Sequence, residues 1–347
     1  MTSCRTARMR CRTVDLEYLA VYRVTLCVLG GTMQDEPASL AFAGAWRRLG
    51  AFLIDMFVLG LAGVIAGYLL FDAMVGLGPW GRLLGFCVAL LYFGVLNSRI
   101  GKGQTLGKRA LGIKVVGRDG GLLPFPGAVV RFAVLGIPWF LNGAWFPPEV
   151  LDSALIYLLS AAVFGLGLAI VYLFVFNRPS RQSLHDMTVG SMVVAAKPGD
   201  SKPALPLKRV HAIAVVVIVF IASSLPYVAA RLVSAAPFAT LMQVYEAVSE
   251  EPGVVHAAVS KGWSSRGGEK TSYLAITAML RDSTVDDPER AGRLARRAIK
   301  ADPATMKLNV VQITLVYGFD IGIASMNRSR AFAHPPAAWT GADAAQD

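Results

Sequence analysis

Asp55 is a carboxylate within a long apolar run, where it could bind a proton or a cation. A charge near mid-membrane costs roughly 2.5–3.5 kcal/mol on insertion scales, so it usually faces the helix bundle or water and has a partner. Arg48 precedes Asp55 by close to two helical turns, so the two residues share a face. They are then about 10 Å apart along the axis, and we expect no direct ion pair. The alternative is a structural carboxylate, paired with Arg131 or Arg48 or hydrogen-bonded to neighbouring helices.

His185 and Asp186 form a second candidate site, in a basic loop that follows another apolar run. A proton relay is conceivable at this pair, because histidine titrates near neutral pH. The structural alternative is that Asp186 caps a helix or ties down its loop through Arg178 or Arg181. Neither site is accompanied by nucleophile–base or metal-ligand spacing. We therefore expect no enzyme activity, no catalytic residue, no metal and no cofactor.

A glycine-rich segment between two apolar runs invites comparison with phosphate-binding loops. Its glycine, threonine and lysine positions are Gly103, Thr105, Gly107 and Lys108. A Walker sequence needs glycine where Lys102 stands, and Arg109 replaces the Ser/Thr that would hold magnesium. The segment instead predicts a tight turn followed by a short strand over 111–117, closed at 119–121. Residues 188–196 form a similar β-prone run, and we expect the two strands to pair.

The order and spacing of these three blocks resemble the RDD family of small membrane proteins, named for one arginine and two aspartates. The resemblance covers about residues 41–197. By position, the arginine is Arg48 or its neighbour Arg47, and the aspartates are Asp55 and Asp186. The family's G-x-T-x-G-K stretch corresponds to Gly103, Thr105, Gly107 and Lys108. His185, which directly precedes Asp186, is counted as a further motif residue. Arg131 stands where such proteins commonly carry a basic residue, and Ser191 replaces a frequent threonine.

Long apolar runs must position these residues. The chain is 54% hydrophobic and only 16% charged, whereas soluble domains carry about 25% charged residues. Four runs reach or nearly reach the roughly 20 residues that cross a bilayer as a helix, at 49–71, 82–98, 153–176 and 210–230. A fifth run, 132–146, is shorter and interrupted by Gly, Pro and Asn. It either crosses the membrane, re-enters it or lies at its surface.

The charges between the runs predict the topology. Residues 41–230 contain sixteen Lys/Arg and seven Asp/Glu, which supply +9 of the net charge of +11. The basic loops 99–119 and 177–209 should both be cytoplasmic, so an even number of helices separates them. We expect five crossings, with the N-terminus cytoplasmic and the C-terminal domain extracytoplasmic. Four crossings are the alternative, with 132–146 at the interface. Basic charge between apolar runs also argues against a nucleic-acid partner.

Four parts of the chain are predicted. The first is an N-terminal segment 1–40, which is either disordered or contains a mis-annotated start, with translation beginning at Met33. The others are an RDD transmembrane domain 41–197, a linker with the last helix 198–235, and an extracytoplasmic α+β domain 236–347. The last part should contain a helix 241–249, strands 254–262 and 272–280, a helix 289–301 and a hairpin of 307–317 and 320–326 across Gly318. Its last dozen residues should be loose. The fold class is thus an α-helical integral membrane bundle of four or five helices followed by a small α+β soluble domain.

Two functions are compatible with this organisation. The resemblance implies a membrane protein in which the bundle moves a cation or proton, since some family members have been linked to cation/proton exchange. In that case Asp55 and Asp186 are sites and Arg48 is a regulating charge. The alternative is a membrane scaffold or adaptor whose outer domain binds an envelope protein, because other members look like accessory parts of larger proteins. We expect the lipid bilayer of the cell membrane as a partner in both cases, and the chain could form a homo-oligomer.

Two further patterns have structural interpretations. Glycines spaced along the first run favour close helix packing within the chain, or alternatively a dimer face, and they are Gly60, Gly63 and Gly67. The helix 289–301 should carry a solvated basic face that could alternatively meet anionic lipid head groups. That face comprises Arg290, Arg293, Arg296, Arg297 and Lys300.

Overall fold

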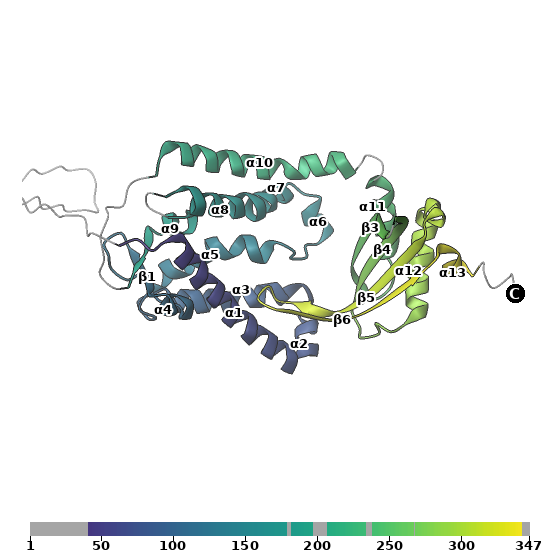
Figure 1. Ribbon diagram of the computed structural model, residues 1–347, viewed down its shortest axis with the longest axis horizontal. Coiled ribbons are helices and arrows are strands. Elements are labelled where there is room, and N and C mark those ends of the chain that lie inside the picture. The colour runs from purple at the N-terminus through teal and green to yellow at the C-terminus, as the bar shows by residue number, and fades with distance from the viewer. Residues whose placement is uncertain (1–40, 179–181, 197–206, 234–237, 267, 342–347) are drawn as a thin grey trace, which may run out of the picture. The chain divides into compact units, whose positions relative to one another are not determined.

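A computed structural model describes residues 41–178, 182–196, 207–233, 238–266 and 268–341 (Figure 1). The predicted segment 1–40, with the proposed start at Met33, lies outside the described residues. Within them, apolar helices are followed by an α+β region built on a four-stranded sheet. The predicted fold class is therefore confirmed.

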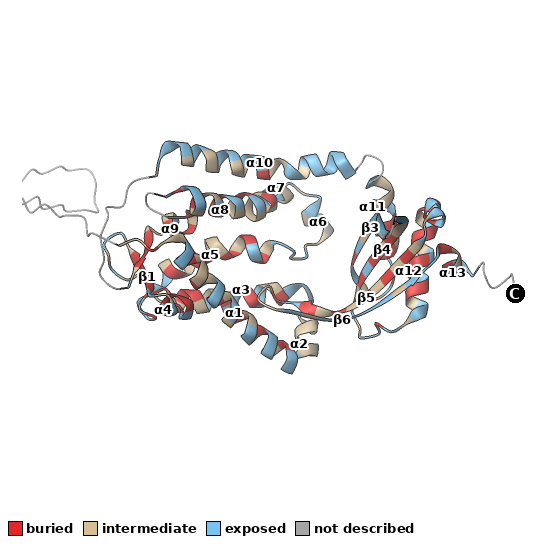
Figure 2. Cartoon of the chain, viewed as in Figure 1, coloured by how far each residue is buried: buried red, intermediate tan, exposed pale blue. Residues whose placement is uncertain are grey.

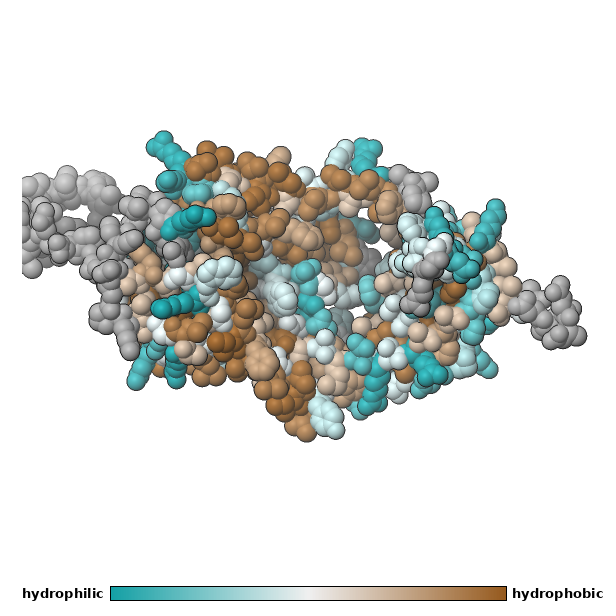
Figure 3. All heavy atoms as spheres, viewed as in Figure 1, coloured by the Kyte–Doolittle hydropathy of each residue, from teal (hydrophilic) through white to brown (hydrophobic). Residues whose placement is uncertain are grey.

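Among the described residues, four helices are long and apolar enough to cross a membrane. They are α1 (Ala45–Leu69), α3 (Gly81–Leu96) with the preceding turn η1 (Gly78–Trp80), the continuous helix of α7 (Leu155–Ser160), η2 (Ala161–Gly165) and α8 (Leu166–Phe176), and α10 (Arg209–Val233). Large apolar side chains point outward from them, and Phe57 of α1 and Phe220 of α10 are 71% and 73% exposed. Figure 3 shows this as brown surface over the helices. An outer surface of this kind suits lipid, which removes the cost of exposing it to water.

A fifth apolar helix, α5 (Phe125–Leu141), is shorter than these four. The sequence placed the start of this segment at Phe132, which is wrong, because the helix begins at Phe125 just after Pro124. Arg82 at the start of α3 donates hydrogen bonds to the carbonyl oxygens of Trp139 and Asn142 at the other end of α5. Near the opposite ends of both helices, a Cβ at Gly94 would come within 2.8 Å of Val129. The helix α5 therefore runs antiparallel along the length of α3.

Short elements between the long helices form a small layer at one end of the bundle. They are α4 (Leu106–Ala110), β1 (Ile113–Gly117), α9 (Leu184–Thr188) and β2 (Ser191–Ala195). Strands β1 and β2 pair antiparallel, with Val115 opposite Val193, so the predicted pairing is confirmed. The turn after β1 closes at Gly120, which has a φ of 77°. These strands carry the residues of both sequence motifs to one place.

The helix formed by α7, η2 and α8 contains a π-helical turn where α10 packs against it. The hydroxyl of Ser160 donates a 2.6 Å hydrogen bond to the carbonyl oxygen of Ala222 in α10. A Cβ at Gly165 would lie 3.2 Å from the Cα of Val219, so the small residue permits the close approach. Small residues and hydroxyl groups are common at interfaces between membrane helices.

The α+β region is an antiparallel and parallel mixed sheet with two helices against it. Its elements are α11 (Phe238–Ser249), β3 (Val254–Arg266), β4 (Glu269–Leu280), α12 (Pro288–Ala301), η3 (Pro303–Lys307), β5 (Val310–Asp320), β6 (Ser325–His334) and α13 (Pro336–Thr340). The strand order is β3-β4-β5-β6, and only the β4–β5 pair is parallel. Fully buried side chains such as Ile276, Leu294 and Ile313 join the sheet to α12. Figure 2 shows buried positions in red on both the strands and this helix. The region thus has its own core.

Two details of this region differ from the sequence prediction. Gly318 does not form a turn: it lies within β5, where a Cβ would be 2.4 Å from the carbonyl oxygen of Met326 in β6. The turn falls instead at residues 321–324, with Gly322 at a φ of 78°. The end of the chain is not loose as far as Thr340. Trp339 is buried, and its Nε1 donates a 3.1 Å hydrogen bond to the carbonyl oxygen of Val311.

The turn between β5 and β6 packs against the bundle through backbone as well as side chains. Asp320 pairs with Arg82 of α3 at 2.5 Å, and Trp139 of α5 donates a 2.8 Å hydrogen bond to the carbonyl oxygen of Gly322. A Cβ at Gly85 would lie 1.7 Å from the carbonyl oxygen of Ile321, so only glycine fits there. We call residues 319–324 the hairpin tip.

The hairpin tip also explains the glycine stripe of α1. A Cβ at Gly63 would come within 2.7 Å of Ala324, and one at Gly67 within 2.3 Å of Phe319. The stripe therefore packs within the chain, as one interpretation held, but against a β-hairpin instead of a helix. The short helix α2 (Phe71–Gly76) adds Asp72, which accepts a 3.2 Å hydrogen bond from Tyr317.

Candidate functional site

Asp186 lies at the centre of a buried charge cluster. It occupies the first turn of α9, where its carboxylate and the Ser183 side chain form a capping box. Its Oδ1 atom accepts hydrogen bonds from Nε and Nη2 of Arg131 at 2.9 and 2.7 Å. Ser191 of β2 donates to the same oxygen at 3.0 Å. The predicted helix cap is present, and within the described part of the chain the nearest basic partner is Arg131 of α5. Arg181, one of the two predicted partners, lies outside the described residues.

Arg48 approaches the same carboxylate from α1. Its guanidinium lies 3.6 Å from Oδ2 of Asp186 and donates a 3.1 Å hydrogen bond to the carbonyl oxygen of Val193. Arg48 and Asp55 do not pair, as their spacing predicted. The cluster thus links two helices with a loop that follows a third, and Arg48, Arg131 and Asp186 are each less than 10% exposed: 9%, 5% and 1%.

The protonation states follow from burial and from these neighbours. Burial alone would raise the pKa of the Asp186 carboxyl, but Arg131, His185 and Arg48 outweigh it and hold the pKa well below its usual range. Burial lowers the pKa of His185 to about 3, although Asp186 acts in the opposite direction. The histidine is therefore neutral at pH 7 while the aspartate is ionised. A proton relay through this pair would have to protonate a histidine that its surroundings keep neutral.

Asp55 lies in a separate set of hydrogen bonds and is fully buried. Its carboxylate accepts hydrogen bonds from the Thr105 hydroxyl at 2.5 Å, the backbone N–H of Gly107 at 2.8 Å and the Tyr92 hydroxyl at 2.8 Å. Three donors satisfy most of the acceptor capacity of a buried carboxylate. The G-x-T-x-G-K stretch is therefore the binding partner of the intramembrane aspartate, and the hydrogen-bonded structural interpretation fits this geometry.

The two motif glycines are required by close contacts. A Cβ at Gly107 would lie 2.0 Å from the carbonyl oxygen of Ala51, so α4 approaches α1 closely enough for its N–H to reach Asp55. Gly103 has a φ of 71°, and a Cβ there would lie 2.5 Å from the carbonyl oxygen of Val115. Both glycines thus shape the turn that presents Thr105 and Gly107.

Lys108 is a buried amine beside this aspartate site. It is 9% exposed, and its Nζ lies 3.4 Å from the Thr105 hydroxyl and 5.8 Å from the centre of the Phe93 ring. Burial, followed by repulsion from Arg131, lowers the pKa of Lys108 to about 7. The motif marked this residue, but nothing in the sequence showed that its amine is buried near two arginines.

A cavity of ≈ 230 Å³ connects these groups. Its charged and polar lining consists of Arg48, Lys108, Arg131, Ser183, His185 and Asp186. The rest of the lining is apolar and comes from α1, α3, α5, α8 and the two strands, with Phe52, Phe132 and Phe174 among its rings. The cavity therefore brings together four of the eight predicted site residues, namely Arg48, Lys108, His185 and Asp186. The other four, Asp55, Gly103, Thr105 and Gly107, do not belong to its lining.

Several contributing residues escaped the sequence interpretation. Tyr92 lies in an apolar run and reads as an ordinary aromatic residue, and Ser183 gave no signal except its capping position three residues before Asp186.

Among the residues that the structure describes, no group of three or more His, Cys, Asp or Glu side chains could hold a metal ion.

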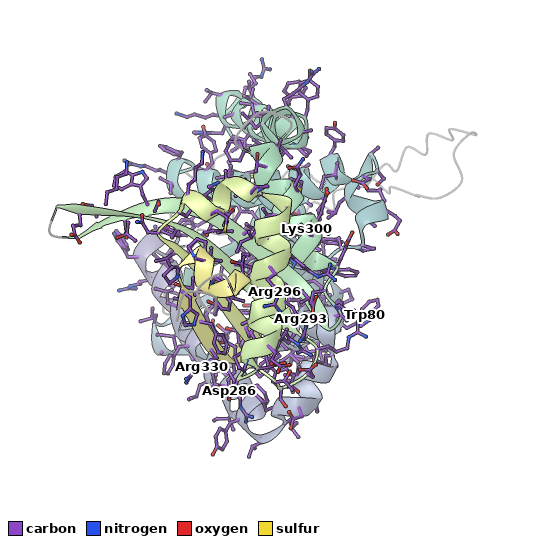
Figure 4. All side chains as sticks on the ribbon, turned by 90° about the vertical axis from the view of Figure 1, so that its right-hand side faces the viewer. Trp80, Asp286, Arg293, Arg296, Lys300 and Arg330 are labelled. Atoms are coloured by element: carbon purple, nitrogen blue, oxygen red, sulfur yellow. The ribbon has the colours of Figure 1, made fainter. Side chains whose placement is uncertain are left out.

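The basic face of α12 is paired with carboxylates to a large extent. Figure 4 shows Arg293, Arg296 and Lys300 following one another along this helix. Arg293 lies 2.8 Å from Glu251, and so does Arg297. Hydrogen bonds from Arg290 lower the pKa of the Asp282 carboxyl to about 2. The predicted solvated face is therefore in good part a set of ion pairs that join α12 to neighbouring loops.

The fold and the cluster together define a multi-pass helical membrane protein with a buried arginine–aspartate centre and an appended α+β domain. Residues 42–190 match the model of the RDD family, which confirms the resemblance for this part of the chain. The chain is also 28% identical over 160 residues to the uncharacterized protein YckC of Bacillus subtilis (strain 168), a stretch that covers 46% of this chain and 89% of YckC. No solved structure gives a significant match. The region beyond the RDD domain is not assigned to any family by these comparisons.

Proposed function

We propose that this protein is a membrane scaffold in which the RDD bundle holds the C-terminal α+β domain in a fixed orientation for an envelope partner. The observation that carries the proposal is the hairpin tip, which packs between α1, α3 and α5. A flexible tether would need no such contact. Here the backbone carbonyl oxygens of Asp320, Ile321 and Ile323 occupy the space that side chains would need at three glycines of the bundle, Gly81, Gly85 and Gly60.

The path of α5 supports an extracytoplasmic position for the domain. Since α5 runs antiparallel along α3 from end to end, it can cross with the four longer helices. Its 17 residues span about 25 Å, close to the roughly 30 Å of a hydrocarbon core. With five crossings and the basic loops on the cytoplasmic side, the proposed position of the domain is extracytoplasmic.

The scaffold proposal is tested at the hairpin tip. Gly85→Leu puts a side chain where the carbonyl oxygen of Ile321 lies, whereas Gly76→Leu on α2 adds the same side chain where nothing lies within 4 Å. Spin labels at Leu61 and Trp263, in a cysteine-free background, report the distance between bundle and domain. We expect a narrow distance distribution in the parent protein and in Gly76→Leu, and a broad one in Gly85→Leu. A broad distribution in the parent protein would refute a fixed orientation.

The cellular role is tested by two further variants. If the domain carries the function, deletion of 236–347 should reproduce the phenotype of a complete deletion, while Asp55→Asn in a correctly folded protein should not. Labelling of cysteines at positions 263 and 328 by an impermeant thiol reagent in intact cells checks the side of the membrane. Protection until the cells are opened would contradict the five-crossing topology.

Proton-linked transport is a second proposal, and Lys108 is the observation that favours it. This buried amine has a pKa of about 7 and lines the cavity, so it can exchange a proton at neutral pH. The carboxylates favour the role less, because Asp55 and Asp186 are already bound by donors and cations. Proton uptake into proteoliposomes should then be abolished by Lys108→Met and retained in Lys102→Met, whose side chain is exposed on the same loop.

A further inference from the structure

The cavity combines a cationic inner wall with apolar outer walls. Two arginines face one ionised carboxylate there, and Lys108 adds a further positive charge when it is protonated. The only hydrogen bond of its Nζ within the described part of the chain is the one to Thr105, at 3.4 Å. An ammonium group has three donors, so Lys108 retains capacity for an anionic ligand.

The apolar walls belong to helices that face lipid. Phe52 of α1, Leu135 of α5 and Phe174 of α8 line the cavity, and so does Val171 of α8, which is 58% exposed on the outside of the bundle. Val171 therefore belongs both to the cavity wall and to the outer surface of the bundle.

We propose that this cavity binds the small anionic head group of a membrane phospholipid, with its phosphate at Lys108 and the start of its acyl chains against Phe52, Phe174 and Val171. Charge complementarity selects the head, because a protonated Lys108 attracts an anion and a phosphate would accept hydrogen bonds that its Nζ does not make within the described part of the chain. The volume of ≈ 230 Å³ favours a compact head group over a large one. The apolar lining selects an amphiphile over a free anion.

This inference is independent of the scaffold proposal, because all of its residues lie in the RDD region. The bundle would carry a bound lipid whether or not the C-terminal domain meets a partner. If the proton-linked proposal holds, the same lysine would serve both roles, so the experiment below measures binding without a proton gradient.

The test is native mass spectrometry of the purified full chain with three probes: phosphatidic acid, phosphatidylcholine of the same acyl chains, and inorganic phosphate. We expect one phosphatidic acid per chain, bound at least roughly tenfold more tightly than phosphatidylcholine, and no retained phosphate. Equal binding of both lipids would overturn the proposal, since it would show an apolar surface without a head-group site. Retention of phosphate alone would overturn the lipid as occupant, because the anion would then suffice.

Two variants locate the binding and one serves as control. Lys108→Met removes the charge and keeps an apolar side chain of similar length, so this variant should fold. Val171→Trp makes the cavity narrower, and it should fold because position 171 is exposed on the outside of the bundle. Each should lower phosphatidic acid binding by roughly tenfold or more, whereas Lys102→Met should leave it unchanged. Unchanged binding in both cavity variants, with melting temperatures at or above the parent value, would refute the site.

Discussion

The buried cluster consists of Arg48, Arg131 and Asp186. The loss of stability on mutating one of them should depend on how much unbalanced charge remains buried, because each substitution removes the same number of charges. Asp186 is the carboxylate that both arginines contact, so Asp186→Asn removes the negative charge that faces Arg131 and Arg48 in the cluster. Arg131→Gln leaves the aspartate with Arg48 at 3.6 Å. We therefore expect Asp186→Asn to destabilise the folded bundle at least as much as Arg131→Gln, and Arg48→Gln to destabilise it least.

The magnitude follows from the contacts. Arg131 donates two hydrogen bonds to Oδ1 of Asp186, at 2.7 and 2.9 Å, and bonds to charged groups contribute roughly 1.5–3 kcal/mol each. Breaking a buried ion pair by removing one partner costs about 3–5 kcal/mol, which agrees with two such bonds. The double variant Arg131→Gln with Asp186→Asn should cost less than the sum of the single variants, with a coupling energy of about 2 kcal/mol or more.

Equilibrium unfolding in mixed detergent micelles gives the free energies for this cycle. Asp152→Asn is the matched control, because Asp152 is exposed in a loop of the same region and should change stability by no more than about 0.5 kcal/mol. Additive effects of the two substitutions would refute the claim that Arg131 and Asp186 act as a pair. A smaller loss for Asp186→Asn than for Arg48→Gln would refute the charge-balance argument.

Three further predictions rest on single contacts. Gly107→Ala should destabilise the bundle by roughly 2–4 kcal/mol through the clash with Ala51 and the lost bond to Asp55, while Gly76→Ala should be neutral or slightly stabilising in the same unfolding assay. The pKa of Lys108 is about 7 in the folded protein and 10.5 ordinarily, so the unfolded chain binds more protons between pH 7 and 10.5. Stability should therefore rise with pH over that window, and Lys108→Met should abolish the rise in melting temperature. His185 is neutral in the folded protein down to a pKa of about 3, so stability should fall as pH decreases below about 6.5, and His185→Phe should flatten that part of the stability–pH curve.

The sequence predicts the membrane helices well because their signal is local. A run of about 20 apolar residues specifies a helix by length alone, and all four long runs are helices in the structure. The start of α5 was missed for a related reason. Arg131 looked like the boundary of an apolar segment, yet it lies inside the helix because Asp186, 55 residues away, neutralises it within the bundle.

The site was predicted by residue type but not by pairing. Spacing along α1 correctly excluded an ion pair between Arg48 and Asp55, since that argument needs only helical geometry. It could not show that Asp55 binds Thr105 and Gly107, because this contact depends on α4 packing against α1 through a glycine. Likewise, the turn at Gly318 was a reasonable inference from a local preference, which the close pairing of β5 with β6 overrides.

The arrangement of charges suggests why the family motif combines a glycine-rich loop with two separate acidic residues. Each carboxylate holds a different part of the small layer at the end of the bundle: Asp55 binds α4, and Asp186 binds α5 and β2 through Arg131 and Ser191. With both carboxylates engaged, Lys108 is the amine that lines the cavity and retains hydrogen-bond donors for a ligand. The two acidic residues thus hold the framework together, and the lysine that follows Gly107 is the group available to a ligand. Lys108→Met keeps the contacts of both aspartates and removes only this amine. It should therefore change ligand binding without unfolding the bundle, which a substitution of Asp55 or Asp186 should not do.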